Sequence, residues 1–547
     1  MLVPAIRRPQ RKSGDHLSAV FLPGRPKSAV RALPDRNSRE KTNSAPLASL
    51  IAGAPVATTS SRPQPVRLLR TFTTPKIVFM IIAAAAPLAA MLTTVPLSFS
   101  IGNGPGVPAL FVFAGLTLLC FSSGYAAISS RISHAGGFYT YIAHGMGRPP
   151  AVSGGIIAVI AYNTVTVGVL GAFAYFAQAL AASHGLNLPW EVWAAAGLVV
   201  VGVLGYRHVE LSARVLAVLM ICEIVILFAL DVAILARHGF SATPAASFAP
   251  HNIFAPGFGV SMMFGMASFI GFESAGLYAE ETRNPERSVP RATIIAVVLI
   301  ATFYGATSWL AVGAVGPSEI QATATADLGD MFFNLSDEYL NSATTTVMQV
   351  LLCTSVLGAW LALHNAANRY MFVLGRDGLL PGRLAAVHPK YKAIHRASVV
   401  QTVFSAVVVA AFALAGLDPY LNMSTSMLGI GTLGIVVLQA MASVAVLGYY
   451  RKRKGGWWQT RIAPVLGAAG LVTAAVLVVR NFAVLTGTTN PVVTALPWAL
   501  LVVGVGGLGY AYWIRSARPE RYAALAQPEE SADGPAVEAL TDVRSAA

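Results

Sequence analysis

Charged residues and cysteine are scarce in this sequence. Asp, Glu, Lys and Arg make up 11% of the 547 residues, whereas 55% of the residues are hydrophobic. Soluble domains carry roughly 25% charged residues, so this composition excludes a water-soluble globule and indicates an integral membrane protein. The three cysteines, Cys120, Cys222 and Cys353, lie inside apolar runs and lack the C-x-x-C spacing of a metal site. We therefore expect neither a bound metal nor a cofactor.

Acidic residues are few and long apolar runs are absent in residues 1–72, which are rich in Arg, Lys, Ser and Pro. Such a segment buries too little surface to fold alone, which predicts a disordered basic tail. Three origins remain open: a cytoplasmic tail attracted to anionic lipid, a translation start placed too far upstream, and an organellar transit peptide. No Met occurs between Met1 and Met80. Because the basic residues behind the net charge of +14 cluster in this tail and in short loops, we expect no nucleic-acid partner.

The rest of the chain is dominated by twelve apolar segments, each long enough to cross a bilayer as a helix of about 20 residues. The segments are long and continuous and do not alternate with period two, which favours helices over a β-barrel. We expect a twelve-helix membrane domain over residues 73–515 and a second disordered tail over the polar, Pro- and Glu-rich residues 516–547. The segments are 77–99, 107–129, 151–182, 188–206, 215–235, 258–279, 293–316, 343–372, 398–416, 421–449, 462–479 and 492–514.

Basic residues are nearly absent from alternate loops. Counted from an inside N-terminus, the odd-numbered loops offer only Arg237 and Arg480. The even-numbered loops carry Arg131, Arg148, Arg207, Arg214, Arg283, Arg287, Arg291, Arg376, Arg383, Lys390, Lys392, Arg396, Arg451, Lys452, Arg453, Lys454 and Arg461. This bias predicts a multi-pass protein of the cell membrane with both termini in the cytoplasm. The acidic loop after the seventh segment is long enough to hold a short extracellular helix.

The sixth segment contains an acid, Glu273, beside a glycine, Gly271, with Ser268 and Ser274 flanking them. An acid at membrane depth costs on the order of 2.5 to 3.5 kcal/mol on insertion scales, so it requires a role. Glycine lowers helix preference by about 1 kcal/mol, which favours an interrupted helix here. The alternative is a buried glutamate that caps a neighbouring helix.

The first segment contains Pro87 near its middle and Pro96 towards its outer end. Proline removes a backbone donor and clashes with the preceding turn, so this helix is either interrupted or merely kinked. Segments one and six are the first members of two five-helix halves, a spacing that indicates an inverted-repeat transporter with a site near the midplane. Helix ends at such a site favour an anionic and a cationic group, and an α-amino acid carries both.

Three blocks of sequence resemble the amino acid–polyamine–organocation (APC) superfamily of permeases. The run SFIGFES followed by AEETRNPERSVPRA is similar to the sixth helix and following loop of that family. AGGFYTYIAHGMGRP, residues 135–149, is similar to the loop before its third span, and NAANRYMFVLGRDGLLP, residues 365–381, to the end of its eighth. The blocks stand in the family's order and span about residues 75 to 515. The resemblance implies a LeuT-type fold, with two inverted five-helix repeats plus two helices.

The resemblance also implies a substrate site made by two stretches. The stretch in the sixth segment is Ser268, Phe269, Ile270, Gly271 and Phe272. In the family its backbone receives the substrate's amino group, and its bulky side chains form a gate over the substrate. In the first segment the matching stretch is Pro87, Leu88, Ala89, Ala90 and Met91. The family's glycine–serine–glycine run is replaced there by alanines and Met91. A larger residue narrows access to the backbone, which makes an amine such as ethanolamine or a polyamine a candidate beside an α-amino acid.

Three more polar residues lie in apolar segments. Glu223 matches a position where relatives of the cationic amino acid transporters carry a lysine thought to replace sodium, so an acid here reverses the charge. It is a candidate to bind a proton, pair with a base, meet a cationic substrate, or form structural hydrogen bonds. Asn163 either lines the substrate path or bonds between helices. Asp231, nearer the outer end of the fifth segment, is expected to be an interface acid.

Together these observations predict a secondary active transporter that imports amino acids or related amines by alternating access. Proton coupling is the preferred driving force, because desolvation favours the neutral form of a carboxyl group and Glu223 or Glu273 can then carry a proton. A substrate–product exchanger and a non-transporting membrane sensor on the same scaffold remain alternatives. No catalytic His, Asp and Glu cluster occurs at the membrane surface, so an enzyme is not expected. The oligomeric state stays open.

Overall fold

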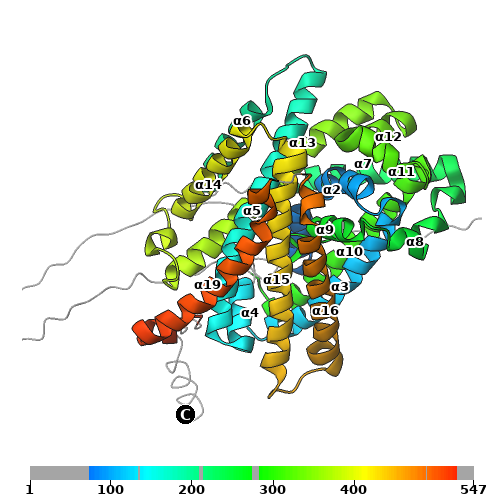
Figure 1. Cartoon of the computed structure of the whole chain (residues 1–547). Coiled ribbons are helices and arrows are strands. Elements are labelled where there is room, and N and C mark those ends of the chain that lie inside the picture. The colour runs from blue at the N-terminus through cyan, green and yellow to red at the C-terminus, as the bar shows by residue number, and fades with distance from the viewer. Residues whose placement is uncertain (1–72, 133–135, 208–212, 274–281, 488–489, 527–547) are drawn as a thin grey trace, which may run out of the picture. The chain divides into compact units, whose positions relative to one another are not determined.

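The computed structural model describes residues 73–132, 136–207, 213–273, 282–487 and 490–526, all within one compact unit (Figure 1). The regular elements of these residues are helices. The chain is an all-α polytopic membrane protein. The predicted tail at residues 1–72 lies outside the described residues, as do residues 527–547 of the tail predicted over 516–547.

Eleven described segments are long and apolar enough to cross a membrane. They are formed by α1 (Thr74–Ala85) with α2 (Pro87–Ile101), α3 (Val107–Ser129), α5 (Arg148–Ser183), α6 (Trp190–Arg207), α7 (Ala213–His238), α10 (Pro285–Val315), α13 (Ser342–Arg376), α14 (His395–Leu414), α15 (Thr425–Tyr450), α16 (Ala463–Arg480) and α19 (Leu496–Ala517). The sixth predicted segment, 258–279, is described only as the shorter α9 (Phe258–Ser268) and the turn after it. The count of twelve spans and the inverted repeat stay predictions.

Short helices connect these spans. The loop after α10, for which we expected one short helix, contains two, α11 (Ile320–Asp327) and α12 (Met331–Tyr339). The chain continues beyond the predicted boundary at residue 515 into α20 (Pro519–Ala524), where the Arg148 guanidinium donates to the carbonyls of Ala523 and Leu525 at 2.8 and 3.3 Å. The remaining short elements are η1 (Gly104–Gly106), α4 (Gly137–Met146), η2 (Gly239–Ala242), η3 (Ala245–Phe248), α8 (Pro250–Ile253), η5 (Leu328–Asp330), η6 (Gly382–Ala385), η7 (Pro419–Ser424), η8 (Trp458–Ile462), α17 (Phe482–Thr486) and α18 (Pro491–Thr494).

Helix α5 is the centre of the packing. It contacts α15, α13, α19, α4 and α6, while α3 lies along α10 and α16 (Figure 1). Small residues permit the closest approaches, as is usual between helices in lipid. A Cβ atom on Gly145 of α4 would collide with the backbone of Ala445 in α15, and one on Gly448 would collide with the carbonyl of Gly145. These contacts set α4 directly against α15.

The first span is interrupted between α1 and α2. Ala86 has φ 44° and ψ 79°, in the left-handed region, and its N–H donates to the Ile82 carbonyl at 3.0 Å. Pro87 explains the position of the break, because proline disfavours helical geometry in the residue before it and is tolerated at the first position of a helix. The interruption expected near Pro87 therefore lies at Ala86, and residues 87–91 form the first turns of α2. Pro96 lies inside α2 without ending it.

A glycine substitution at Ala86 tests this geometry. An alanine in the left-handed region carries strain of roughly 1 kcal/mol that glycine avoids, which offsets the greater flexibility of glycine in the unfolded chain. We expect Ala86→Gly to leave the apparent melting temperature of the purified protein unchanged or slightly raised. The matched variant Ala90→Gly, inside α2, should lower stability by about 1 kcal/mol or more. Equal losses in the two variants would contradict the left-handed turn at Ala86.

Candidate functional site

The sixth span is interrupted directly after α9. The helix ends at Ser268, and the chain then runs through a non-helical turn to Glu273. Gly271 has φ 110°, a conformation open to glycine and strained for other residues. Residues 274–281, which lead into the charged loop, lie outside the described residues, and the rest of that loop runs into α10. The helix thus ends where Gly271 and Glu273 predicted an interruption, and the predicted continuation of the segment over residues 274–279 lies outside the described residues.

Glu273 stabilises this interruption from within. Its Oε1 accepts a hydrogen bond from the Tyr162 hydroxyl at 2.7 Å, and its Oε2 accepts one from the Gly271 N–H at 3.1 Å. The Tyr125 hydroxyl donates to the Glu273 carbonyl at 3.4 Å, and the Tyr162 ring stacks on Tyr370 with centroids 4.9 Å apart. The side chain is buried. Glu273 thus caps the segment in which it lies. The alternative drawn from the sequence was that it caps a neighbouring helix.

Glu223 occupies the corresponding place at the first interruption. It is buried in α7, and the Ser355 hydroxyl of α13 donates to its Oε2 at 2.7 Å. The Leu88 backbone N–H in the first turn of α2 also donates to this carboxyl group. On the other side of the break, the Tyr304 hydroxyl of α10 donates to the Ala85 carbonyl at 3.4 Å. Side chains from neighbouring spans therefore hydrogen-bond to backbone groups that the break leaves without a partner in the helix.

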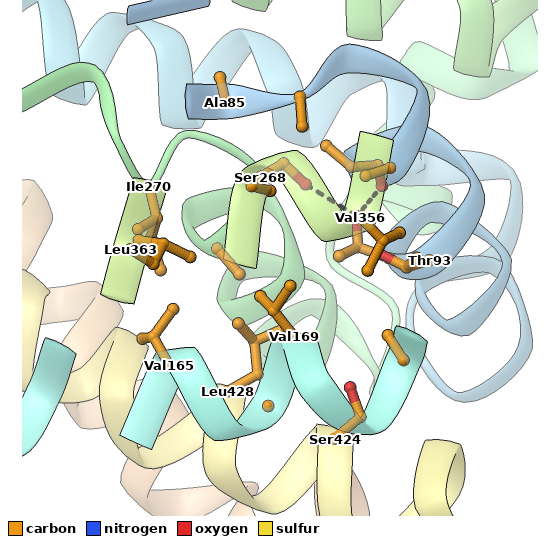
Figure 2. Close-up of a pocket in the computed structure, with 18 residues that line it drawn as sticks. Ala85, Thr93, Val165, Val169, Ser268, Ile270, Val356, Leu363, Ser424 and Leu428 are labelled. Atoms are coloured by element: carbon orange, nitrogen blue, oxygen red, sulfur yellow. Dashed lines mark hydrogen bonds between the residues drawn. The ribbon is translucent and has the colours of Figure 1, made fainter. Parts of the chain in front are cut away.

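A hydrogen bond joins the two interrupted spans directly. The hydroxyls of Thr94 in α2 and Ser268 in α9 lie 2.8 Å apart. Each hydroxyl also lies within hydrogen-bond distance of a carbonyl on its own helix, Thr94 at 2.6 Å from Ala90 and Ser268 at 2.8 Å from Phe264. Because each hydroxyl has one proton, one of the two donates across to the other helix while the other donates to its own carbonyl. A dashed line in Figure 2 marks the contact made by the Ser268 hydroxyl. This contact thus connects α2, which follows the first break, with α9, which precedes the second.

A cavity of about 60 Å³ lies between these interruptions and α5. Figure 2 shows Ala85 of the first span on one side and Val165 and Val169 of α5 on the other. No charged side chain is among its lining residues, and the polar side chains there are hydroxyls. The lining consists of Ala85, Ala86, Ala89, Ala90, Thr93, Thr94, Val165, Gly168, Val169, Ala172, Ala267, Ser268, Ile270, Val356, Ala359, Leu363, Ser424 and Leu428.

The predicted site residues divide into two groups around this cavity. Ala89, Ala90, Ser268 and Ile270 line it. The others adjoin the two breaks or lie on α5 and α7 without lining the cavity, and their roles stay predictions. They are Pro87, Leu88, Met91, Asn163, Glu223, Phe269, Gly271, Phe272 and Glu273.

Asn163 is turned towards its own helix. Its amide donates to the Val159 carbonyl at 2.6 Å, and its backbone carbonyl accepts a bond from Gln401 of α14 at 3.5 Å. The lining residues that sequence reasoning missed include Thr93, Thr94 and Ser424. The signal for them was weak, because isolated hydroxyl residues in an apolar helix usually bond to the preceding turn. Within the described ranges, no three His, Cys, Asp or Glu side chains meet as a metal site would require.

The fold and the cavity define a class, a polytopic helical membrane protein with helix breaks at Ala86 and after Ser268 beside a small cavity. Residues 72–508 match the family model described as amino acid permease. The chain belongs to the amino acid permease family, within the APC superfamily that the three sequence blocks resemble. The resemblance stated from the sequence is confirmed.

Several curated relatives carry transporter names. The chain is 28% identical to the branched-chain amino acid permease BcaP of Bacillus subtilis, over 63% of this chain and 74% of the relative. It is 24% identical to the methylthioribose transporter of the same organism, over 63% and 74%, respectively. It is 26% identical to the uncharacterized amino acid permease YecA, also of B. subtilis, over 64% and 80%.

Removal of the Tyr162 hydroxyl tests the cap on Glu273. We expect Tyr162→Phe to lower the apparent stability of the purified protein by about 1 to 3 kcal/mol, because a buried carboxyl oxygen loses its donor. Thermal unfolding in detergent measures this change. The matched variant Tyr125→Phe removes only a longer bond to a backbone carbonyl and should lower stability less. A loss at Tyr125 equal to or larger than that at Tyr162 would contradict the assigned cap.

Proposed function

We propose that the chain is a secondary active transporter that imports amino acids or related amines by alternating access, driven by protons. The observation that carries this proposal is the cavity between two helix interruptions. Membership of the amino acid permease family supports the class of function. The proposal also places the protein in the cell membrane with both termini in the cytoplasm. The distribution of basic residues among the loops supports this orientation.

The ends of the interrupted helices supply the chemistry for an amino acid. Ala89 lies in the first turn of α2, and the positive end of this helix attracts a carboxylate. Ser268 ends α9, where the Met266 and Ala267 carbonyls already accept from the N–H groups of Phe269 and Ile270, so an ammonium group is attracted by the negative end of the helix as a whole. Both residues line the cavity. An α-amino acid offers the two charges in the arrangement that these helix ends favour.

The lining also limits the rest of the substrate. A second charge on the substrate, as in a polyamine, would have no charged side chain to pair with among the lining residues. We therefore place small neutral amino acids first and polyamines last among the candidates. The name of the BcaP relative, a branched-chain amino acid permease, fits this order. Because another relative is named a methylthioribose transporter, the family alone does not fix the substrate.

Proton coupling rests on the contacts of Glu223. Its carboxyl group joins α7 to Ser355 of α13 and to Leu88 at the start of α2. Burial favours the neutral form of a carboxyl group, and the positive end of a helix favours the ionised form. Protonation of Glu223 therefore weakens its hold on the start of α2, which links the protonation state to the position of the first span. Glu273 is the second candidate, since it holds the sixth span in the same way.

Uptake into proteoliposomes tests the proposal. An imposed inward proton gradient should drive accumulation of a neutral amino acid, found beforehand by thermal-shift screening against amino acids, ethanolamine and polyamines. Glu223→Gln should weaken the response to the gradient, while substrate exchange continues, because glutamine keeps the shape of the side chain but does not titrate.

Three results of the uptake experiment would contradict the proposal. Uptake that ignores the gradient, with Glu223→Gln and Glu273→Gln both intact, would exclude proton coupling. Uptake that requires internal substrate would favour an exchanger, and ligand binding without any flux would favour a membrane sensor.

Filling the cavity tests the location of the substrate. Ala89→Leu adds three carbon atoms to a side chain that lines a space of about 60 Å³. We expect this variant to fold but to lose the thermal shift produced by the substrate in the unmodified protein. The matched variant Ala411→Leu lies on an exposed face of α14 and should keep the shift. An unchanged shift in Ala89→Leu would place the substrate elsewhere.

A further inference from the structure

A second buried acid on α7 is not used by the site described above. Asp231 lies two turns before the end of the helix, and its side chain is 7% exposed. The Thr307 hydroxyl of α10, itself 1% exposed, donates to Oδ2 at 2.7 Å. The other oxygen, Oδ1, is buried and has no hydrogen-bond partner among the described residues. Asp231 is therefore a buried acid with one oxygen bonded to Thr307 and the other without a protein partner among the described residues.

No charged side chain pairs with this carboxyl group in the part of the chain that the structure describes. Helix α7 packs against α10, α13, α2, α12, α1 and η2, and within the described ranges none of their side chains forms an ion pair with Asp231. Arg237 and His238, at the end of α7, bond to Glu338 at 3.6 Å and to the Tyr339 hydroxyl at 2.6 Å instead. The titratable residues of these elements whose side chains the structure describes are Cys222, Glu223, Arg237 and His238 on α7, Lys76 on α1, Arg287, Arg291 and Tyr304 on α10, Asp337, Glu338 and Tyr339 on α12, and Cys353, His364, Arg369, Tyr370 and Arg376 on α13.

The chemistry of such a site is that of proton binding. An ionised carboxylate with a single hydrogen bond in apolar surroundings is strongly disfavoured, whereas the neutral acid requires little compensation. A proton that adds to Oδ1 converts the unpartnered oxygen into a hydroxyl group and removes the charge. The Thr307 bond to Oδ2 holds in both states, because that oxygen remains an acceptor. The reverse step returns the proton to water.

We propose that Asp231, positioned by Thr307, is a second proton-binding site of the transport cycle. The inference rests on the proposed proton-driven function and assigns a second coupled proton to it. Asp231 and Glu223 lie eight residues apart on α7, about 12 Å along the helix. Asp231 bonds to α10, whereas Glu223 bonds to α13 and the start of α2. The two acids thus connect one helix to different neighbours.

Infrared spectroscopy of the full chain in lipid nanodiscs tests proton binding without transport. The difference spectrum between acidic and alkaline pH should contain the carbonyl stretch of a buried carboxylic acid, and Asp231→Asn should remove one such band. Thr307→Val should shift the same band in frequency while the protein stays folded. Asp337→Asn, an exposed acid of α12, should leave it unchanged. A spectrum unaltered by Asp231→Asn, or a band at Asp231 that does not respond to pH, overturns the inference.

Accumulation ratios test the coupling. With the membrane potential clamped at zero, each coupled proton multiplies the steady-state substrate ratio by about ten for a gradient of about one pH unit. Two protons give a ratio of about one hundred, and Asp231→Asn should lower it about tenfold while exchange continues. An unchanged ratio overturns the role of Asp231 in coupling. If the unmodified protein ignores the gradient while the infrared band still titrates, the proton-driven function fails and the proton site stands.

Discussion

The backbone hydrogen bond is the constraint on which this structure depends. Water is absent at membrane depth, so a helix that breaks there must find other partners for its free N–H and C=O groups. At the first break the Tyr304 hydroxyl serves the Ala85 carbonyl, and Glu223 accepts from the Leu88 N–H. At the second break Glu273 accepts from the Gly271 N–H. A buried acid thus stabilises each interruption, although an acidic residue is otherwise unfavourable at membrane depth.

The same constraint explains why the acids lie beside the cavity and not in it. A carboxyl group that serves a helix break is directed towards backbone and hydroxyl donors, as Glu273 is towards Tyr162 and Gly271. The cavity itself is left with small apolar side chains and a few hydroxyls, among them Thr94 and Ser268. In the proposed function, the helix ends bind the charged groups of the substrate and the apolar residues of the cavity contact its side chain. Proton binding and substrate binding would then share elements but use different atoms.

Much of the fold could be predicted from the sequence, because long apolar runs in a chain with so little charge leave few alternatives to membrane helices. The predicted segment 107–129 coincides with α3, and the unusual residues Pro87 and Gly271 marked both interruptions. The break at Ala86 itself was missed by one residue, since alanine carries no signal for a left-handed turn. The cavity wall on α5 was also missed. Val165 and Val169 look like any lipid-facing or core residues until the packing of α5 against both breaks is known.

The two interruptions also differ in stiffness. The first break lies at Ala86, whose Cβ atom permits only a narrow range of left-handed conformations. The next residue, Pro87, has a fixed φ. The second turns on Gly271, which has access to conformations on both sides of φ zero. The backbone at Gly271 can therefore change its angles with less strain than the backbone at Ala86. A change of conformation at the cavity would strain the first span more than the sixth.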